Sequence, residues 1–297
     1  MLSSPVDYRE FSIALASLFR PELSGVIEYS FGHNPKALGT MIVGDRIDFL
    51  DRVYRFSRLL PCSAIWRSAV HKFARSTNPP IYFLRIEGEN DASLENVTLY
   101  GRFLQPITTR TLCNALSDSP FQWDAPSLHT LSRLVESNGP HGVGLRLNVD
   151  GSCGIAVYFD VHAERDDFCR RLLEPLVVEM GWPALVADEI ARDLPQLYFA
   201  GKIGVLGLGS SNTDKQLTLK LDAHNVPLRR ALAFTRNKGI PPSRLAELAR
   251  SVRMLGGEAV NYVSMKYGAF GFSGWKFYIS VRPNRQTVAL SPRFAIG

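Results

Sequence analysis

Residues Gly144–Phe168 read GLRLNVDGSCGIAVYFDVHAERDDF. Apolar and polar residues alternate on both sides of Asp150-Gly151, which is the period of a β-strand with two unlike faces. Asp-Gly tolerates positive φ, so we expect a two-residue turn between two antiparallel strands. The charged cluster at 164–167 then places acidic side chains in the first turn of a helix, where they suit the helix dipole. The stretch therefore predicts a hairpin followed by a helix.

The same hairpin-then-helix unit recurs along the chain. Hairpins begin near residues 24, 80, 142, 201 and 259, so successive starts are 56, 62, 59 and 58 residues apart. A period this steady indicates an internal structural repeat. Ten antiparallel strands with helices between the pairs form one barrel when they close, because closure removes the edges and the helices cover the outer face. We expect an α+β fold: a closed antiparallel β-barrel of about ten strands inside a ring of α-helices, as one domain over residues 1–297.

Two further local patterns bear on this architecture. The run Gly204–Ser211 (GVLGLGSS) superficially suggests a phosphate-binding loop, but it lacks the GK[ST] ending and no helix follows. We interpret its glycines as making space on a strand. Ser243–Leu255 has a buried apolar stripe at helical spacing, with Ser243 as the expected N-cap. The last strand pair is expected at Ala259–Tyr267 and Trp275–Val281.

The composition is that of an ordinary globular protein. The 297 residues are 45% hydrophobic and 21% charged, with no run of about 18 apolar residues to span a membrane. Charged residues at 7, 9 and 10 stand where a signal peptide needs an apolar core, so we expect a cytoplasmic location. The cysteines form no CxxC pair and the histidines show no ligand spacing, so neither a disulfide framework nor a zinc site is predicted.

The inner face of the expected barrel is the candidate site. A ten-stranded barrel is wider than an eight-stranded one, whose side chains already fill its interior, so we expect a lumen that holds ligands. The candidate inward residues are Glu28, Arg85, Tyr100, Arg102, Arg146, Asn148, Tyr158, Thr218, Lys220, Tyr262, Lys266, Lys276 and Tyr278. Lysine and arginine there would hold a multiply charged anion, and tyrosine rings would shield a carbocation. The alternative is that these are exposed charges on half-buried sheets.

Three stretches, Gly144–Phe168, Leu197–Gly201 and Ile27–Ser30, resemble the cyanobactin prenyltransferases, which are peptide-modifying αββα-barrel prenyltransferases. The likeness extends weakly over nearly the whole chain. It implies transfer of a prenyl group, dimethylallyl or geranyl, from its diphosphate to a side chain of a cyclic or linear peptide. It also implies Mg²⁺ assistance to the diphosphate, a monomer, and a prenyl diphosphate and a macrocyclic peptide as partners, with no nucleic acid and no membrane.

Carried over residue by residue, the resemblance makes Glu28 the candidate base for the acceptor. The candidate diphosphate-binding residues are Arg85, Arg102, Arg146, Lys202, Lys220, Lys266 and Lys276. The candidate residues that shield the allylic cation are Tyr100, Tyr158, Phe199, Tyr262 and Tyr278. No protein ligand is assigned to a metal, and the DDxxD cluster of helical terpene enzymes is missing.

Two positions depart from the family pattern. Met41 stands about where the family tends to have an arginine, and Thr98 stands near an expected lysine. The basic residues that can compensate are Arg46, Arg85, Lys202, Lys220 and Lys266.

Two other classes of function remain open. The net charge of +6 and the arginines at 52, 55 and 58 are compatible with a nucleic-acid-binding module, although no nucleic-acid motif is present. A fivefold α/β propeller hydrolase acting on guanidino groups relies on a cysteine late in the chain. Here the last cysteine is Cys169, which argues against that class.

Overall fold

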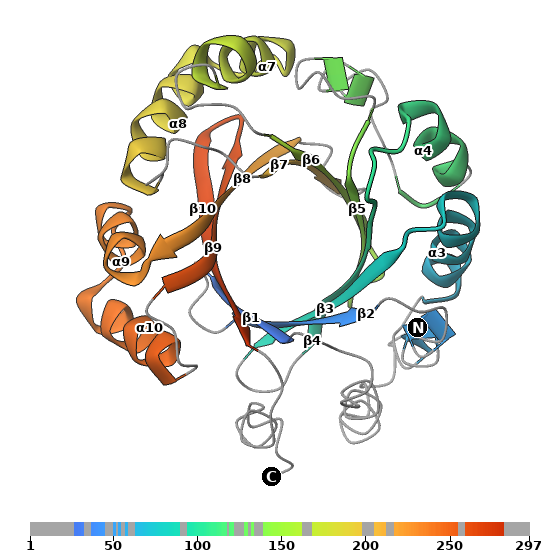
Figure 1. Ribbon diagram of the computed structural model, residues 1–297, viewed down its shortest axis with the longest axis horizontal. Coiled ribbons are helices and arrows are strands. Elements are labelled where there is room, and N and C mark those ends of the chain that lie inside the picture. The colour runs from blue at the N-terminus through green and yellow to red at the C-terminus, as the bar shows by residue number, and fades with distance from the viewer. Residues whose placement is uncertain are drawn as a thin grey trace.

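The computed structural model describes a sheet that closes on itself inside a ring of helices (Figure 1). The described residues are 27–32, 37–44, 50–51, 53–54, 57–58, 63–89, 94–117, 119–121, 128–129, 132–133, 139–161, 168–197, 205–211, 217–254 and 259–281. Within them the strands are β1 (Ile27–Gly32), β2 (Ala37–Gly44), β3 (Ile81–Glu89), β4 (Leu94–Arg102), β5 (Gly142–Asn148), β6 (Cys153–Asp160), β7 (Val205–Ser211), β8 (Thr218–Pro227), β9 (Ala259–Gly268) and β10 (Gly271–Val281).

The helices lie on the outside of the sheet (Figure 1). They are α3 (Ser63–Thr77), α4 (Thr109–Leu116), the π-helical segment η1 (Phe168–Leu173), α7 (Glu174–Glu179), α8 (Ala184–Leu197), α9 (Leu228–Asn237) and α10 (Pro242–Met254). None of the helices in the described part of the chain has the length and apolarity that crossing a membrane requires.

The strand order follows the chain, because each strand pairs with its neighbours in sequence. The order around the barrel is β1-β10-β9-β8-β7-β6-β5-β4-β3-β2, and every pair is antiparallel. The first and last strands pair from Ile27 opposite Val281 to Gly32 opposite Lys276. The predicted α+β architecture, an antiparallel barrel sheet with helices outside it, is confirmed.

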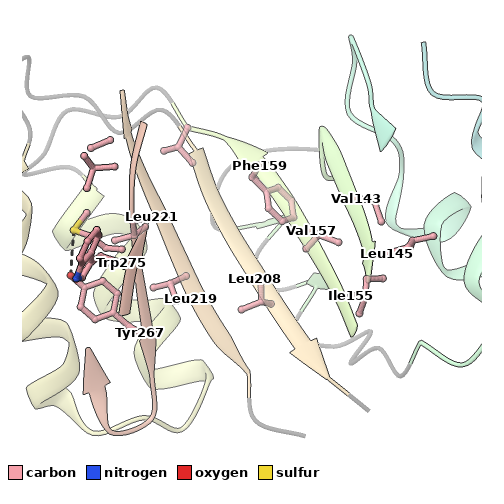
Figure 2. Close-up of a cluster of buried hydrophobic side chains, with 14 of the residues drawn as sticks. Val143, Leu145, Ile155, Val157, Phe159, Leu208, Leu219, Leu221, Tyr267 and Trp275 are labelled. Atoms are coloured by element: carbon pink, nitrogen blue, oxygen red, sulfur yellow. Dashed lines mark hydrogen bonds between the residues drawn. The ribbon is translucent and has the colours of Figure 1, made fainter. Parts of the chain in front are cut away.

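The hydrophobic core lies between the barrel and the helices. Figure 2 shows part of it, formed by alternate residues such as Val143 and Leu145 of β5 and Val157 of β6, which are fully buried. Trp66 of α3 reaches the same layer and donates its indole N–H to the carbonyl of Leu145 at 3.2 Å. Because side chains alternate along a strand, burying these residues on the outer face leaves their polar neighbours to the inner face.

The hairpin turn at Asp150-Gly151 is longer than predicted. The Asn148 N–H donates to the Ser152 carbonyl at 2.9 Å, so three residues form the loop rather than two. The Asp150 carboxylate accepts a hydrogen bond from the Ser152 N–H at 2.9 Å, and Gly151 adopts a φ of 82°. The aspartate side chain therefore stabilises the wider turn, and glycine supplies the left-handed conformation that ends it.

Two boundaries also differ from the expectation. Helix α10 begins at Pro242, so Ser243 lies inside the helix rather than at its N-cap; proline suits the first helical position, where an N–H has no partner. Strand β10 begins at Gly271 and not at Trp275, because a bulge between Phe272 and Gly274 lets the strand continue past its irregular pairing. The charged cluster at 164–167 lies outside the described residues.

A buried ionic network holds two helices against the barrel. Lys238, after α9, contacts Glu189 at 3.1 Å and Asp193 at 2.6 Å, both on α8. Asp193 also accepts a hydrogen bond from the Tyr267 hydroxyl of β9 at 2.8 Å. Glu189 accepts one from the backbone N–H of Phe272 in β10 at 2.9 Å. Helix α8 and the end of α9 are thus fastened to β9 and β10 by hydrogen-bonded charges.

Replacing Tyr267 by phenylalanine tests this network. The variant removes the phenol donor from Asp193, whose side chain is 6% exposed. We expect the free energy of unfolding in urea to fall by about 1–3 kcal/mol, the usual cost of leaving a buried acceptor short of a donor. Tyr82→Phe is the matched control, because Tyr82 is buried too and its hydroxyl has no hydrogen bond to the residues that the structure describes. Equal losses in the two variants would contradict this role of Tyr267.

Candidate active site

The central feature of the inner face is a carboxylate held between two cations. Glu87 of β3 accepts from Arg85 at 2.6 Å and also forms an ion pair with Lys276 of β10. Its second oxygen accepts a hydrogen bond from the Asn96 amide at 3.0 Å. Arg85 in turn donates to the Tyr278 hydroxyl at 2.9 Å. These contacts join β3, β4 and β10 across the barrel, although β3 and β10 are far apart in sequence.

A third cation lies beside two aromatic rings. The ammonium of Lys220 in β8 lies 5.2 Å from the ring centroid of Tyr158 and 5.2 Å from that of Tyr278. It pairs with Asp222 at 3.1 Å. Arg85 approaches the same Tyr278 ring, with its guanidinium carbon 4.8 Å from the centroid. Arg85 and Lys220 therefore lie beside the Tyr278 ring, and Lys276 shares the Glu87 carboxylate with Arg85. We call these three side chains the cation cluster.

Solvent reaches this cluster in spite of its place inside the barrel. The side chain of Lys276 is 37% exposed and that of Lys220 is 25% exposed. The apolar residues on the outer face of the same strands, such as Leu219 and Phe277, are fully buried. Because the helices cover the outer face, this exposure belongs to the interior of the barrel. A charged ligand can thus meet these cations without displacing the hydrophobic core.

Burial and pairing set the charges of the cluster. Burial raises the pKa of Glu87, but Arg85 and Lys276 outweigh it and hold that pKa well below its usual value. Burial likewise opposes the charge of Lys220, but Asp222 raises its pKa well above the usual value. For Lys276 burial dominates and lowers the pKa to about 8, although Glu87 opposes the shift. Burial raises the pKa of Tyr278, so its phenol is protonated at neutral pH.

Glycines opposite the tyrosines let their rings lie against the barrel wall. Tyr100 of β4 pairs with Gly144, and Tyr158 of β6 pairs with Gly207 of β7. A Cβ at Gly144 would lie 2.6 Å from a carbon of the Tyr100 ring, and one at Gly207 would lie 3.0 Å from the Tyr158 ring. The two rings are 5.8 Å apart between centroids. The interpretation of the Gly204–Ser211 glycines as space on a strand is confirmed for Gly207.

The second aromatic pair continues the inner face toward the end of the barrel where the strands connect to helices. The rings of Tyr278 and Tyr262 are 6.4 Å apart between centroids, and Tyr262 meets His224 edge-on at 4.6 Å. His224 is one position before Asn225, which has a positive φ of 51°, and the register of β8 with β9 is the same before and after Asn225. Burial lowers the pKa of His224, so its imidazole is neutral at neutral pH.

Arg102 is not part of the cation cluster. It forms a two-pronged ion pair with Asp160 of β6, with one N–O distance of 2.9 Å. This pair lies near the same end of the barrel, where the Asp160 backbone N–H donates to His141. A guanidinium already engaged by both oxygens of a carboxylate has fewer donors left for a diphosphate. The structure thus separates Arg102 from Arg85, Lys220 and Lys276.

The remaining candidates are placed by strand register. Arg85 pairs with Met41 on one side and with Thr98 on the other, and Thr98 pairs with Arg146. Lys266 is exposed and pairs with Lys220. Glu28 has its backbone in β1 opposite Ser280 and Met41, and its side chain lies outside what the structure describes. Lys202, Phe199 and Arg46 lie outside the described residues.

Sequence reasoning missed the carboxylates. Glu87 and Asp222 alternate with Arg85 and Lys220 at a spacing of two, so each carboxylate shares a strand face with the cation that it holds. That spacing was the available signal, because a cation at i and an acid at i+2 on a strand are neighbours on one face. The missed residues explain how like charges gather inside a barrel.

The described carboxylates of the inner face are engaged by cations rather than placed around a magnesium site. Within the described part of the chain no group of three or more histidine, cysteine or acidic side chains is placed to hold a metal ion. The inner-face carboxylates that are described, Glu87, Asp160 and Asp222, are each paired with a lysine or arginine. A carboxylate engaged in this way is a poor ligand for Mg²⁺, which prefers free oxygen donors. The donor set suits an anion instead.

No protein-family model matches the chain, and no curated protein matches its sequence. Solved structures do match it. The prenyltransferase PriB, in a complex with L-tryptophan and dimethylallyl thiolodiphosphate, superposes with a TM-score of 0.59 and 12% identity over 94% of both chains. AnaPT from Neosartorya fischeri gives a TM-score of 0.64 and 11% identity over 89% of this chain and 81% of that one.

A third match is 6-dimethylallyltryptophan synthase from Micromonospora olivasterospora, in a complex with DMASPP and Trp. It gives a TM-score of 0.56 and 13% identity over 93% of this chain and 92% of that one. The chain has the fold of a prenyltransferase barrel. At 11–13% identity these matches show a shared fold. The prenyltransferase-barrel fold implied by the sequence resemblance is confirmed.

Gly144→Ala tests the close packing of the aromatic wall. The added methyl group would overlap the Tyr100 ring, which then has to leave its place beside Tyr158. We expect the free energy of unfolding to fall by about 1–3 kcal/mol, as for other overpacked sites. Gly268→Ala is the control, because a Cβ there would meet nothing within 4 Å. Thermal and urea denaturation of both variants measures the difference, and an unchanged Gly144→Ala protein would show that the ring has room to move.

Proposed function

We propose that this protein is a prenyltransferase that moves a dimethylallyl or geranyl group from its diphosphate to a side chain of a cyclic or linear peptide. The observation that carries the proposal is the cation cluster in a prenyltransferase-type barrel. Lys220 lies 5.2 Å from two tyrosine rings, and Arg85 and Lys276 lie beside the same carboxylate. The complex of PriB with dimethylallyl thiolodiphosphate supports the donor class.

The proposed chemistry uses both the cations and the tyrosine rings of this arrangement. The bond between C1 of the prenyl group and the diphosphate oxygen breaks, and its electron pair leaves with the diphosphate. Arg85, Lys220 and Lys276 stabilise that growing negative charge, since fixed cations at a partly desolvated site are favourable without reorganisation. The rings of Tyr158 and Tyr278, with Tyr100 and Tyr262 beyond them, face the allylic cation with their electron-rich surfaces and keep water from it.

Arg85 is our proposed replacement for the two cradle positions that depart from the family. Arg85 pairs with Met41 on one neighbouring strand and with Thr98 on the other, so its long side chain is attached between the two positions. Its hydrogen bond to the Tyr278 hydroxyl directs it toward the inner face, where Lys220 also lies beside the Tyr278 ring. Arg146, one strand further along the same row, and Lys266, opposite Lys220, extend the positive inner face. Lys202 remains a sequence-based member of the cradle.

The acceptor side of the reaction is assigned from the sequence resemblance. A nucleophilic atom of the peptide side chain forms the new bond to C1, and a base takes up the proton that this atom loses. Glu28 is the proposed base. Its backbone in β1 lies opposite Met41 of β2, which in turn lies opposite Arg85 of β3. Strand β2 alone therefore separates the backbone of Glu28 from that of Arg85. No step is assigned to Mg²⁺, because the described carboxylates are engaged by cations.

The direct test is to incubate the full-length protein with dimethylallyl diphosphate or geranyl diphosphate and a set of cyclic and linear peptides. Mass spectrometry should detect a peptide that gains one prenyl unit, and fragmentation should locate the modified side chain. Peptides that carry tyrosine, tryptophan, histidine and arginine cover the nucleophiles at issue. Free tryptophan is the competing acceptor, and its exclusive modification would overturn the peptide part of the proposal while leaving prenyl transfer intact.

Lys276→Ala removes one cation from the cluster. We expect kcat/KM for the prenyl diphosphate to fall about tenfold or more, because one charge-assisted contact is worth about 1.5–3 kcal/mol. Steady-state kinetics with varied donor measures the effect, and Lys238→Ala is not a suitable comparison because it breaks the structural network of α8. Arg75→Ala, at an exposed position on α3 outside the barrel, is the control. Unchanged kinetics in folded Lys276→Ala would remove Lys276 from the cradle.

The pKa of Lys276 adds a pH dependence to the same residue. Because burial lowers that pKa to about 8, the free protein loses the Lys276 charge as the pH rises through that value. Diphosphate binding favours the charged form, so above this pH binding is linked to uptake of a proton and the donor affinity should decline. Lys276→Arg keeps its charge throughout, so its affinity should stay level. Calorimetry of both proteins between pH 7 and about 9.5 compares the profiles, and identical profiles would contradict the assignment.

Glu28→Gln separates the base from the donor site. If the carboxylate accepts the acceptor's proton, its loss should lower kcat by about 10²–10⁴-fold, the usual contribution of a general base. Donor binding, measured by calorimetry, should remain because the cation cluster is intact. Loss of donor binding together with loss of stability would instead show that Glu28 is an ion-pair partner inside the barrel.

A further inference from the structure

One pair of helices carries a strong excess of positive charge. Residues 228–254, which comprise α9, the following turn and α10, contain seven basic residues and one acidic residue. Their net charge of +6 equals the formal net charge of the whole chain. The remaining residues of the chain together have a formal net charge of zero. Residues 228–254 are therefore a strongly positive segment of the chain.

Four of these basic side chains are exposed: Arg229 and Arg236 on α9, and Arg250 and Arg253 on α10. Positions seven apart, or three apart, lie on one face of an α-helix, so each helix presents its two arginines together. We call these four residues the arginine surface. None of them forms an ion pair with a carboxylate in the part of the chain that the structure describes. By contrast, Lys238 and Arg244 are held by acidic neighbours.

The two helices are fixed in place from beneath. Leu228, Ala231 and Phe234 of α9 are buried against the barrel, where α9 packs on β8 and β9. Leu245, Leu248 and Val252 of α10 are buried in turn, and α10 packs on α9. Neither helix needs its arginines for packing. The backbone that carries these guanidinium groups is already ordered, so an anionic partner does not have to order it on binding.

We propose that the arginine surface docks an acidic polypeptide segment. All four exposed cations are arginines, whose planar forks fit carboxylates with two hydrogen bonds. Single-stranded nucleic acid is the weaker fit, because its binding surfaces supply aromatic rings for stacking. Phe234 is the only aromatic residue in 228–254, and it is fully buried. An anionic membrane is also a weaker fit, because the apolar sides of both helices are buried and only Met254 is an exposed large apolar residue there.

The arginine surface starts beside one end of the barrel. Arg229 lies in the first turn of α9, five residues after His224 on the inner face of β8. The chain passes from β8 into α9 without a loop, since β8 ends at Pro227 and α9 begins at Leu228. A polypeptide held on the arginine surface would therefore lie next to that end of the barrel. The docking itself is independent of the reaction, so its test needs no prenyl donor.

The test measures binding of a fluorescein-labelled oligoglutamate peptide to the full-length protein by fluorescence anisotropy. We expect saturable binding that weakens as salt is raised, and no binding of the same peptide with every glutamate replaced by glutamine. A variant that carries Arg229→Gln, Arg236→Gln, Arg250→Gln and Arg253→Gln should bind the peptide with an affinity that is lower by about tenfold or more. Its circular dichroism and melting should match those of the unmodified protein, because these side chains are exposed.

The matched control replaces four exposed arginines elsewhere, namely Arg75, Arg110, Arg133 and Arg192. Each variant removes four positive charges, so both have a formal net charge of +2 instead of +6. The control should bind the peptide as the unmodified protein does. Equal weakening in both variants would show attraction by net charge alone and would overturn the proposal. Tighter binding of an oligonucleotide than of the oligoglutamate peptide, lost in the α9–α10 variant, would also overturn it by assigning the surface to nucleic acid.

Discussion

The Glu87 carboxylate, held by Arg85 and Lys276, is the interaction on which the inner face depends. Cations inside a protein repel one another and lose hydration, so they are stable together only when acidic groups and hydrogen bonds compensate them. Glu87 joins Arg85 on its own strand to Lys276 on β10, across the barrel. Asp222 pairs with Lys220 on its own strand, β8. Each cation is therefore oriented before any ligand arrives, and two acids against three cations leave an excess of positive charge.

The aromatic part of the site depends on the absence of side chains opposite it. Gly144 and Gly207 lie where any Cβ would press on the rings of Tyr100 and Tyr158. The register between neighbouring strands places Tyr100 opposite Gly144 and Tyr158 opposite Gly207. Flat rings along the wall keep the space before them for a ligand, and they stay within reach of Lys220.

The helices pack on the barrel with their apolar sides and present charged residues on their opposite sides. Their apolar sides, together with the Asp193–Lys238 ion pair, hold the barrel from outside. On α9 and α10 the opposite sides present exposed arginines, and residues 228–254 together carry a net charge of +6. The inner face is thus positive through residues that acids hold in place, whereas the arginine surface is positive through residues that have no acidic partner in the described part of the chain. These two kinds of positive charge suit different ligands, a buried diphosphate and an exposed acidic chain.

The sequence by itself determined the repeating hairpins, because a period of two and a period of about four are local properties of neighbouring residues. It also determined which residues face inward, since Arg85, Tyr158, Lys220 and Tyr278 follow from that alternation. Only the tertiary structure decided which of them meet. Glu87 and Lys276 are 189 positions apart, and their contact exists because β10 returns to β1 when the barrel closes. Arg102 alternates in the same way, yet Asp160 engages it elsewhere, because pairing partners depend on register between distant strands and not on local pattern.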